Sequence, residues 1–288
     1  MPALDLREYF SARKALVDEG LDERLPSRDI EPCTVHEAMR YATLAGGKRL
    51  RPILSLTVSE LGRRAPTSVL DAACGIELLH TGSLVIDDLP SMDDAQTRRD
   101  TDCTHVRFGE ATALLAALGL VALAFDLVTR NAETMGVPEA GLRAVRELSA
   151  VMGTDGIVGG QHIDLHLRAH PDTPVLLESM FEKKAAALFL ASLRIPAILV
   201  GLPEPDLDAL TRYGRCLGLA FQITDDLLDS QAAPGDGNEA THAAHLGVAG
   251  ARARVKELTK AAVAALDPLG DRAEPLRVIA EHVSARTM

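Results

Sequence analysis

The sequence predicts an all-α fold, and three observations support this prediction. Long segments carry apolar residues at spacings of three and four, which is the period of a helix face. Alternating apolar and polar stretches of the kind that mark strands are almost absent. Some segments, such as ALLAALGLVALAF at 113–125, are apolar nearly all round, as helices buried among other helices are. We therefore expect a multi-helix bundle.

Helix-period segments separated by Gly, Pro and polar clusters give the expected elements in chain order. The predicted helices are 34–45, 53–62, 67–89, 108–134, 138–156, 159–169, 175–200, 205–230, 241–266 and 272–286. The polar stretch QAAPGDGNEATHAAH at 231–245 is predicted to be a loop. No change in composition marks a boundary, so we expect one domain over residues 1–288.

Composition and charge exclude several classes of function. The chain is 47% hydrophobic, which is enough for a large core, and its net charge of −11 opposes binding to nucleic acid or to an anionic membrane. The longest uncharged run, 111–125, is shorter than the roughly 18 residues of a membrane span. We therefore expect no stable membrane insertion. The first residues show no signal-peptide pattern and the four cysteines are widely spaced, so we expect a cytoplasmic protein.

A first acidic cluster, DDLPSMDD at 87–94, follows an apolar helical segment. Pro90 cannot continue a helix, so Asp87 and Asp88 should lie at the helix end and Asp93 on the loop beyond it. Carboxylates without His or Cys suit Mg²⁺, which keeps water ligands and is often completed by substrate phosphates. One such cluster alone is more often a solvated helix end.

A second acidic cluster, DDLLD at 225–229, also follows apolar sequence. Asp225 and Asp229 are four residues apart, so their like charges lie on one helix face and destabilise it unless something compensates. Two clusters of this kind favour a metal site over solvated helix ends. We expect both to face one shared space.

Basic residues near these clusters predict two anion sites, one bridged by metal and one bound directly. In GGKRLRP at 46–52, two glycines allow close approach of the backbone, and the basic residues that follow stand before a helix-starting proline. Each basic residue alone could be an ordinary surface charge, and a lone His an ordinary core residue. The candidates are Lys48, Arg49, Arg51, His80, Arg98, Arg99 and Lys184.

Five ordered motifs together resemble the trans-isoprenyl diphosphate synthases, the family of farnesyl and geranylgeranyl diphosphate synthases. They are GGKRLRP, DDLPSMD with Arg98 and Arg99, FGEATA at 108–113, GGQHIDL at 159–165 and FQITDDLLD at 221–229. The resemblance covers about residues 34 to 266. It implies the all-α isoprenoid synthase fold around a central cavity, a homodimer and Mg²⁺. It also implies head-to-tail condensation of isopentenyl diphosphate with dimethylallyl, geranyl or farnesyl diphosphate.

The resemblance also implies roles for individual residues. Metal ions that bind the allylic diphosphate would be held by Asp87, Asp88, Asp93, Asp225, Asp226 and Asp229. Catalysis at that diphosphate would use Asp87, Asp93 and Asp225 together with Arg98, Lys184 and Gln222. Isopentenyl diphosphate would be bound by Lys48, Arg51, His80 and Arg99.

Chain length of the product is expected to depend on Gly82 and Ser83, about one helical turn before Asp87. Family members that stop at C15 tend to carry an aromatic residue at one of these positions. The two small residues therefore suggest a C20 product, geranylgeranyl diphosphate, unless a deeper leucine closes the channel. The candidate leucines are Leu78, Leu79, Leu115 and Leu118.

Several departures from the family pattern keep alternatives open, and two of them bear on the site. Asp100 replaces the usual Gly after the arginines, and the stretch 231–245 lacks the lysines that members usually offer there. The alternatives are a farnesyl diphosphate synthase (C15), a class I terpene cyclase on the same fold, and a non-catalytic partner subunit. GGKRLRP and His80 argue against the cyclase, and the six aspartates argue against the partner subunit.

Overall fold

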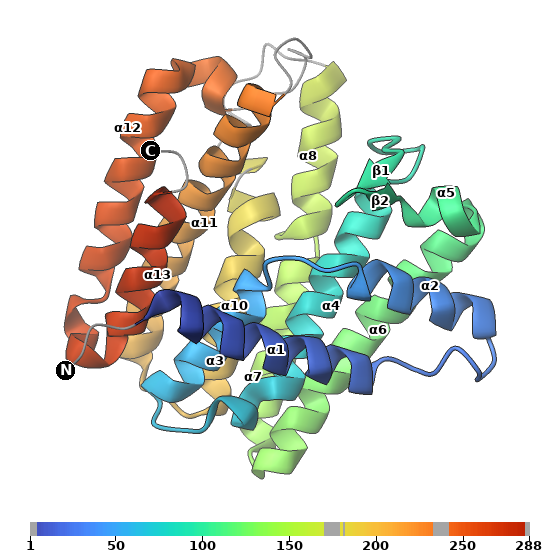
Figure 1. Cartoon of the computed structure of the whole chain (residues 1–288). Helices are drawn as coiled ribbons and strands as arrows, with labels where there is room; N and C mark the ends of the chain where they lie inside the picture. The colour runs from blue at the N-terminus through green and yellow to red at the C-terminus, as the bar shows by residue number, and fades with distance from the viewer. Residues whose placement is uncertain (1–4, 170–178, 181, 233–241, 286–288) are drawn as a thin grey trace. The chain divides into compact units, whose positions relative to one another are not determined.

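A computed structural model describes residues 5–169, 179–180, 182–232 and 242–285 of the chain (Figure 1). Two compact units are formed by residues 1–148 and 149–288, with their boundary inside helix α7. Within the described residues, one two-stranded hairpin is the only sheet, which confirms the predicted all-α class. The expectation of one domain over the whole chain stays a prediction.

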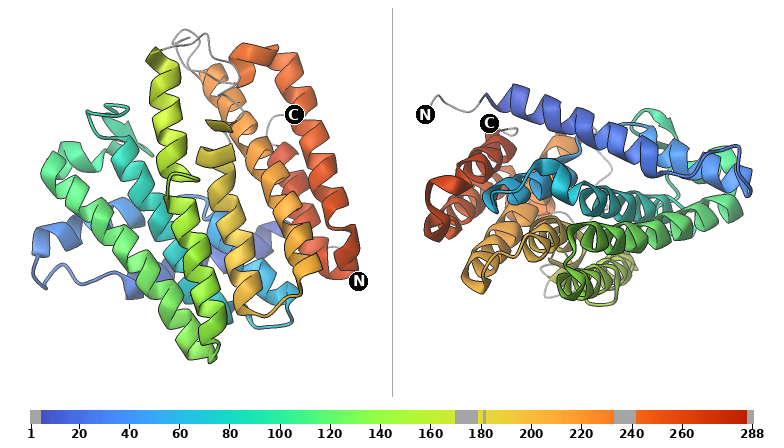
Figure 2. Two further views of the ribbon diagram at one scale, coloured as in Figure 1. Left: turned by 180° about the vertical axis from the view of Figure 1, so that it is seen from behind. Right: turned by 90° about the horizontal axis from the view of Figure 1, so that it is seen from below.

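Unit 1 is built on the antiparallel pair of α4 and α6, which run side by side (Figure 2). Helices α2, α3 and α1 pack against this pair. The elements are α1 (Leu6–Arg24), α2 (Cys33–Leu44), α3 (Leu50–Leu61), the 3₁₀ helix η1 (Pro66–Val69), α4 (Leu70–Asp87), β1 (Thr97–Arg98), β2 (Thr101–Asp102), α5 (Thr104–Phe108), α6 (Glu110–Met135) and α7 (Pro138–Met152).

Unit 2 is built around α11, which packs against α10, α12 and α13. The hydroxyl of the fully buried Tyr213 on α11 donates to the Leu276 carbonyl oxygen of α13 at 2.7 Å. The elements are α8 (Ile157–Ala169), the π-helix η2 (Glu182–Ala186), α10 (Ala187–Leu199), α11 (Glu204–Ala232), α12 (His242–Ala265), the 3₁₀ helix η3 (Asp267–Ala273) and α13 (Glu274–Ala285).

Most predicted helices are confirmed with boundaries shifted by a few residues, but α1 is a helix that the sequence patterns did not predict. Its buried apolar side chains, Tyr9, Val17 and Leu21, are too widely spaced to form a strong apolar stripe. Its N-terminal signal was present, because the Asp5 side chain accepts hydrogen bonds from the Arg7 and Glu8 backbone N–H groups. Part of the predicted helix at 175–200 and most of the predicted loop at 231–245 lie outside the described residues.

Glycines bring α4 and α6 into backbone contact. A Cβ atom on Gly75 would lie 2.9 Å from the Ala124 carbonyl oxygen, and one on Gly82 would lie 3.2 Å from that of Ala117. Two helices can approach this closely only where a side chain is missing. Gly82 therefore has a packing reason to be small, besides the role in chain length that the sequence suggested.

Among the residues that the structure describes, two helical stretches are long and apolar enough to cross a membrane by length and composition, a test that core helices of soluble proteins also pass. Most of the stretch Pro66–Asp87 is buried in the structure. In the stretch Glu110–Met135, only 39% of the apolar 18-residue segment is buried, since α6 carries large apolar side chains on an exposed face. The feature that needs an explanation is therefore the uncovered face of α6.

We expect Gly75→Ala to lower the free energy of unfolding by about 1–3 kcal/mol, because the new methyl group would press on the α6 backbone. Gly119→Ala is the matched control on α6. Its Cβ would meet the flexible end of Met39, and the gain in helix propensity, about 1 kcal/mol, should offset that contact. Urea denaturation followed by circular dichroism measures both. Equal stability of the two variants would contradict the backbone contact.

Candidate functional site

Helix α4 ends at the first acidic cluster, as predicted. Asp87 is its last residue and Asp88 follows as the C-cap with helical backbone angles. The Asp93 backbone N–H then donates to the Asp87 carbonyl oxygen at 2.9 Å. The loop therefore folds back and returns Asp93 to the helix end. The side chain of Asp87 is largely buried, whereas Asp93 is exposed.

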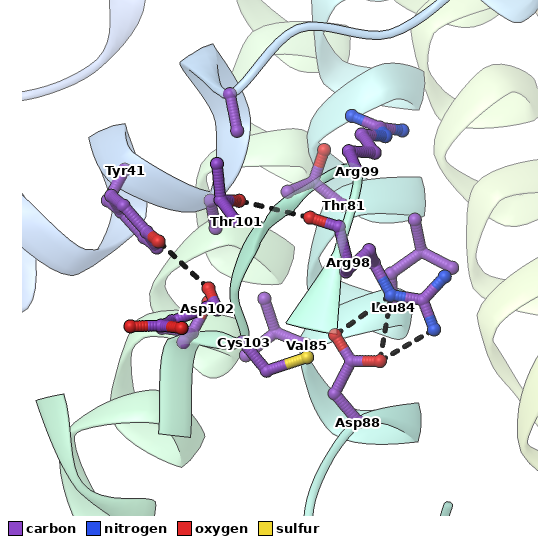
Figure 3. A pocket seen from close by; sticks show the side chains of 13 residues that line it. Tyr41, Thr81, Leu84, Val85, Asp88, Arg98, Arg99, Thr101, Asp102 and Cys103 are labelled. Carbon is purple, nitrogen blue, oxygen red and sulfur yellow. Dashed lines mark hydrogen bonds and ion pairs between the residues drawn. The ribbon is translucent and has the colours of Figure 1, made fainter. Parts of the chain in front are cut away.

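Asp88 is held by the protein itself (Figure 3). The Arg98 Nε atom donates to both carboxylate oxygens of Asp88, at 2.7 and 2.9 Å, and Arg98 Nη2 lies 2.6 Å from Oδ1. Burial, together with the nearby carboxylate of Asp88, raises the pKa of the Cys103 thiol to about 11. Burial by itself would lower the pKa of Arg98, but the hydrogen bonds and the charge of Asp88 outweigh that effect. The pKa is therefore raised overall, and Arg98 stays charged. Asp88 thus anchors the segment that carries the two arginines.

That segment is the β1–β2 hairpin, in which Arg98 pairs with Thr101. Its two turn residues, Arg99 and Asp100, both have positive φ (54° and 63°), as a two-residue hairpin turn of type I′ requires. The family's usual Gly at position 100 suits such a backbone, and Asp is one of the few other residues that tolerate it. The departure at Asp100 therefore keeps the turn. A pocket beneath the hairpin is lined by residues of α2, α4 and both strands (Figure 3).

The glycines of GGKRLRP bring the loop before α3 against this hairpin. Arg99 Nη1 donates to the Gly46 carbonyl oxygen. A Cβ atom on Gly47 would lie 2.9 Å from the same nitrogen, so a side chain there would displace the guanidinium. Gly46 and Gly47 have φ of 95° and 133°, values that other residues rarely adopt. The two glycines therefore leave the space that the Arg99 side chain occupies against the loop.

Arg51 and His80 meet in the same region. Arg51 Nη1 lies 3.2 Å from His80 Nε2. Burial, helped by the positive charges of Arg51 and Arg99, lowers the pKa of His80 well below its usual range. A neutral His80 can accept a hydrogen bond from Arg51 through Nε2. The structure thus gathers three of the four predicted isopentenyl diphosphate ligands, and the fourth, Lys48, is exposed on the adjoining loop.

The expectation that Arg49 belongs to the anion-binding group is wrong. Its guanidinium is buried and donates to Glu77 at 2.9 Å, to Asp18 at 2.8 Å and to the Thr43 carbonyl oxygen at 2.7 Å. Burial lowers the pKa of Arg49, but the carboxylates of Glu77 and Asp18 raise it above its usual range. Sequence alone could not separate this arginine from its neighbours, because the partners are far apart in the chain.

In unit 2, Lys184 lies on the π-helix η2, a form that is often found at functional sites. Its Nζ atom is 2.7 Å from Asp164 Oδ2 of α8. Glycines on both neighbouring helices allow close packing: a Cβ on Gly160 would lie 2.7 Å from the Lys184 backbone nitrogen, and one on Gly218 2.8 Å from Ala186 Cα. The backbone that carries Lys184 is therefore fixed by contacts with α8 and α11.

The second acidic cluster lies on α11, as predicted. Asp225 and Asp226 are half-buried, and Gln222 Nε2 donates to Asp226 Oδ1 at 2.9 Å, one helical turn apart. Asp229 is in the same helix, but its side chain lies outside the described residues. The expectation that the two acidic clusters face one shared space stays a prediction.

The candidate chain-length residues lie on α4. The Ser83 hydroxyl donates to the His80 carbonyl oxygen at 2.9 Å, and its side chain is almost fully buried. Among the leucines proposed to close a channel, Leu78 and Leu79 are fully buried. Leu115 and Leu118 are each 54% exposed, so they lie on the surface of unit 1 and not in its interior.

The donor atoms of the two clusters fit a hard cation such as Mg²⁺, because all are carboxylate oxygens. Within the described part of the chain, no three His, Cys, Asp or Glu side chains come close enough to hold a metal ion alone. Mg²⁺ usually keeps several waters and completes its shell with substrate phosphates. Asp88 is already bonded to Arg98.

Several residues with a part in the site carried no clear signal in the sequence. Asp164 pairs with Lys184, and Cys103 lines the same pocket as Asp88. The Tyr41 hydroxyl donates to the Asp102 carbonyl oxygen at 2.8 Å, which ties the hairpin to α2. Glu77 is a buried acid in an apolar helix, and that pattern could have been noticed. Asp164 lies within the GGQHIDL motif, where no role was assigned to it, whereas Cys103 and Tyr41 are common residue types in unremarkable local sequence.

The sequence is similar to those of known synthases. Geranylgeranyl pyrophosphate synthase 3, chloroplastic, of Arabidopsis thaliana is 43% identical over 230 residues, which cover 79% of this chain but only 63% of that protein. Geranylgeranyl pyrophosphate synthase 9, chloroplastic, of the same plant is 37% identical over 300 residues, covering 99% of this chain and 82% of that protein.

Solved structures show the same similarity in three dimensions. An FPP/GFPP synthase from Zymomonas mobilis has a TM-score of 0.89 at 34% identity, covering 97% of this chain and 99% of that chain. A geranyltransferase from Legionella pneumophila has a TM-score of 0.88 at 28% identity, covering 98% and 96%. The family model of polyprenyl synthetases matches residues 32–241. The chain therefore belongs to the polyprenyl synthetase family and has the all-α isoprenoid synthase fold of that family.

Proposed function

We propose that the protein is a Mg²⁺-dependent prenyltransferase that condenses isopentenyl diphosphate head to tail with allylic diphosphates. The observation that carries this proposal is the contact between the basic loop and the hairpin in unit 1. There Arg51, His80 and Arg99 gather beside Arg98, which is bonded to the first acidic cluster. A reaction between two diphosphates needs two sites. Here the basic side chains can bind one diphosphate directly, and the neighbouring carboxylates suit a metal ion that binds the other.

The allylic diphosphate is bound, in this proposal, by the aspartates of both clusters through metal ions. The proposed ligands are Asp87, Asp93, Asp225, Asp226 and Asp229, with Asp88 in support through Arg98. Bound Mg²⁺ would supply positive charge against the diphosphate as it leaves. Arg98, Lys184 and Gln222 would donate further hydrogen bonds to its oxygens.

Isopentenyl diphosphate is bound, in this proposal, by Lys48, Arg51 and Arg99, with His80 beside them. Guanidinium groups bind phosphate oxygens in pairs, which fixes the direction of the ligand as well as its position. A neutral His80 orients Arg51 without adding a charge of its own. Holding both substrates in a set orientation makes the coupling effectively intramolecular, which is a large share of catalysis for such a reaction.

Geranylgeranyl diphosphate is the product that the observations favour. The curated relatives reported above carry that product in their names, and Gly82 and Ser83 leave no bulky group one turn below Asp87. Farnesyl diphosphate is the second candidate, because the Zymomonas mobilis structure is described as an FPP/GFPP synthase.

We also propose that the protein acts as a homodimer through α6. Leu114, Leu115 and Leu118 lie on adjacent turns of this helix and are 44%, 54% and 54% exposed. A cluster of large apolar side chains on a surface usually marks an interface. A second copy could cover the same face in a two-fold symmetric contact, since such contacts use one patch on both partners.

We further propose a cytoplasmic location. All four cysteines are free thiols, and Cys74 and Cys103 are buried. Reduced thiols without a disulfide framework suit a reducing compartment.

The purified protein with Mg²⁺ is expected to convert isopentenyl diphosphate and an allylic primer to geranylgeranyl diphosphate. Dimethylallyl, geranyl and farnesyl diphosphate are offered in turn, and the products are dephosphorylated and identified by mass spectrometry. Asp87→Asn should lower kcat by about a hundredfold or more, because a charge that holds the metal is lost.

The matched control is Asp94→Asn. Asp94 is exposed, stands beside Asp93 and has a positive φ that Asn tolerates, so its turnover should stay at the wild-type level. Cyclic hydrocarbons formed without isopentenyl diphosphate, or turnover that does not need a metal, would argue against the proposed reaction.

Ser83→Phe is expected to shift the product from C20 to C15. Ser83 lies four residues before Asp87 and is almost fully buried, so an aromatic ring there should shorten the space for the growing chain. Ser83→Ala should leave the product length unchanged. Gly82→Phe is less informative, because it would also press on α6. An unchanged C20 product from Ser83→Phe would mean that another residue sets the length.

Leu115→Glu combined with Leu118→Glu should convert a dimer into monomers, because two charges would be buried at the proposed contact. Ile30→Glu, on an equally exposed apolar residue of the α1–α2 connection, should leave the dimer intact. Light scattering coupled to gel filtration measures the mass of each variant. A dimer that survives the double substitution places the interface elsewhere.

A further inference from the structure

The buried ion cluster of Arg49, Glu77 and Asp18 has no role in the proposed reaction. Arg49 and Glu77 are each 2% exposed, which is rare for charged residues unless they are paired. Each of the three guanidinium nitrogens of Arg49 already has a protein acceptor: Nε bonds Asp18, Nη1 bonds Glu77 and Nη2 bonds the Thr43 carbonyl oxygen. Because its side chain is also buried, the guanidinium cannot reach a substrate while this cluster is intact.

The backbone of Arg49 is held in an unusual conformation. Its φ of 51° and ψ of 29° are left-handed, and it is the N-cap of α3. A residue other than Gly, Asn or Asp keeps such angles only where its surroundings enforce them. The hydrogen bonds of the buried guanidinium to α1, α2 and α4 supply that constraint. The cluster thus sets the direction in which the chain enters α3.

Every proposed ligand of isopentenyl diphosphate either lies within a few residues of this cluster in the sequence or contacts the loop that carries Arg49. Lys48 precedes Arg49 and Arg51 follows it by two residues. Gly46 and Gly47, on the same loop, contact the Arg99 guanidinium.

Glu77 lies three residues before His80 on α4, and its carbonyl oxygen accepts the Thr81 hydroxyl at 2.9 Å. Burial lowers the pKa of Arg99, and Glu77 is the charge that opposes this shift most strongly. The cluster therefore connects the loop before α3, through Arg49, with helix α4, through Glu77, and α4 also carries His80.

We propose that Arg49 and Glu77, with Asp18, are positioning residues that hold Lys48, Arg51 and Arg99 at the spacing required by isopentenyl diphosphate. This inference rests on the proposed function and adds a specific consequence. The cluster sets affinity for isopentenyl diphosphate and leaves binding of the allylic substrate largely unaffected, because the residues proposed for that substrate are anchored differently. Arg98 is held by Asp88, and Lys184 by Asp164.

The test replaces the pair by apolar residues of similar length, Arg49→Met with Glu77→Met. Replacing both partners of a buried ion pair often preserves stability, whereas removing one leaves an unpaired buried charge. We expect the melting temperature to stay near that of the wild type and the KM for isopentenyl diphosphate to rise by about ten- to a hundredfold. The KM for the allylic substrate and the kcat should change by less than about threefold, because the substitution weakens the binding of isopentenyl diphosphate alone.

Two single variants separate geometry from charge. Arg49→Lys keeps the charge but cannot reach three acceptors at once, so it should raise the KM for isopentenyl diphosphate as the double variant does. Glu77→Gln keeps an acceptor of the same shape for Arg49, and Asp18 still balances the charge, so its KM should lie near the wild-type value.

The matched control is Arg24→Met with Asp71→Met. Arg24 Nε donates to Asp71 at 2.6 Å and joins α1 to α4 as the cluster does, but near the N-terminal end of α4. This control should leave both KM values unchanged. An increase in the KM for isopentenyl diphosphate here, or its absence in the Met–Met variant of Arg49 and Glu77, would overturn the positioning role.

Calorimetry of isopentenyl diphosphate binding without metal or allylic substrate keeps the two proposals distinguishable. Binding by the wild type that weakens in the Arg49 and Glu77 variant supports the inference even if turnover fails. Equal binding by both proteins overturns it and leaves the proposed reaction standing. If the wild type itself does not bind isopentenyl diphosphate, both the positioning role and the proposed reaction are contradicted.

Discussion

Backbone contact between α4 and α6 is the constraint on which the rest of unit 1 depends. Gly75 and Gly82 let the two helices approach until a Cβ atom would touch the opposite carbonyl oxygens. Helix α4 then carries His80 in its middle and ends at Asp87, so one element fixes part of the direct anion site and the start of the acidic cluster. A shift of α4 would move both together.

Charge balance around α4 and the hairpin involves two groups of residues. The first contains the proposed ligands of isopentenyl diphosphate, among which Arg51 and Arg99 place positive charge near a neutral His80. The second consists of two anchors, each an arginine paired with a buried carboxylate: Arg98 with Asp88, and Arg49 with Glu77. Like charges brought close together need such compensation, and the anchors also fix geometry, because a guanidinium bonded to several acceptors has little freedom.

Local pattern predicted most helices and the ends of those that carry the acidic clusters. The apolar period marked α4 and α11, and Pro90 correctly indicated where α4 stops. The pattern failed at α1, whose fold depends on contacts far away in the chain: the Tyr9 hydroxyl reaches Thr57 and Glu60 of α3. Local sequence also could not assign Arg49 and Arg51, two neighbours of the same type, to opposite environments.

The sequence by itself determined the helical class, the two carboxylate clusters and the basic residue types near them, because helix period, proline and formal charge are properties of the local chain. Tertiary structure alone decided which of these charges are open and which are already paired. Asp88 and Arg98 are 10 residues apart, and Arg49 and Glu77 are 28 residues apart. Burial and hydrogen bonding depend on what the fold brings next to a side chain, and residue type and spacing do not encode that neighbour.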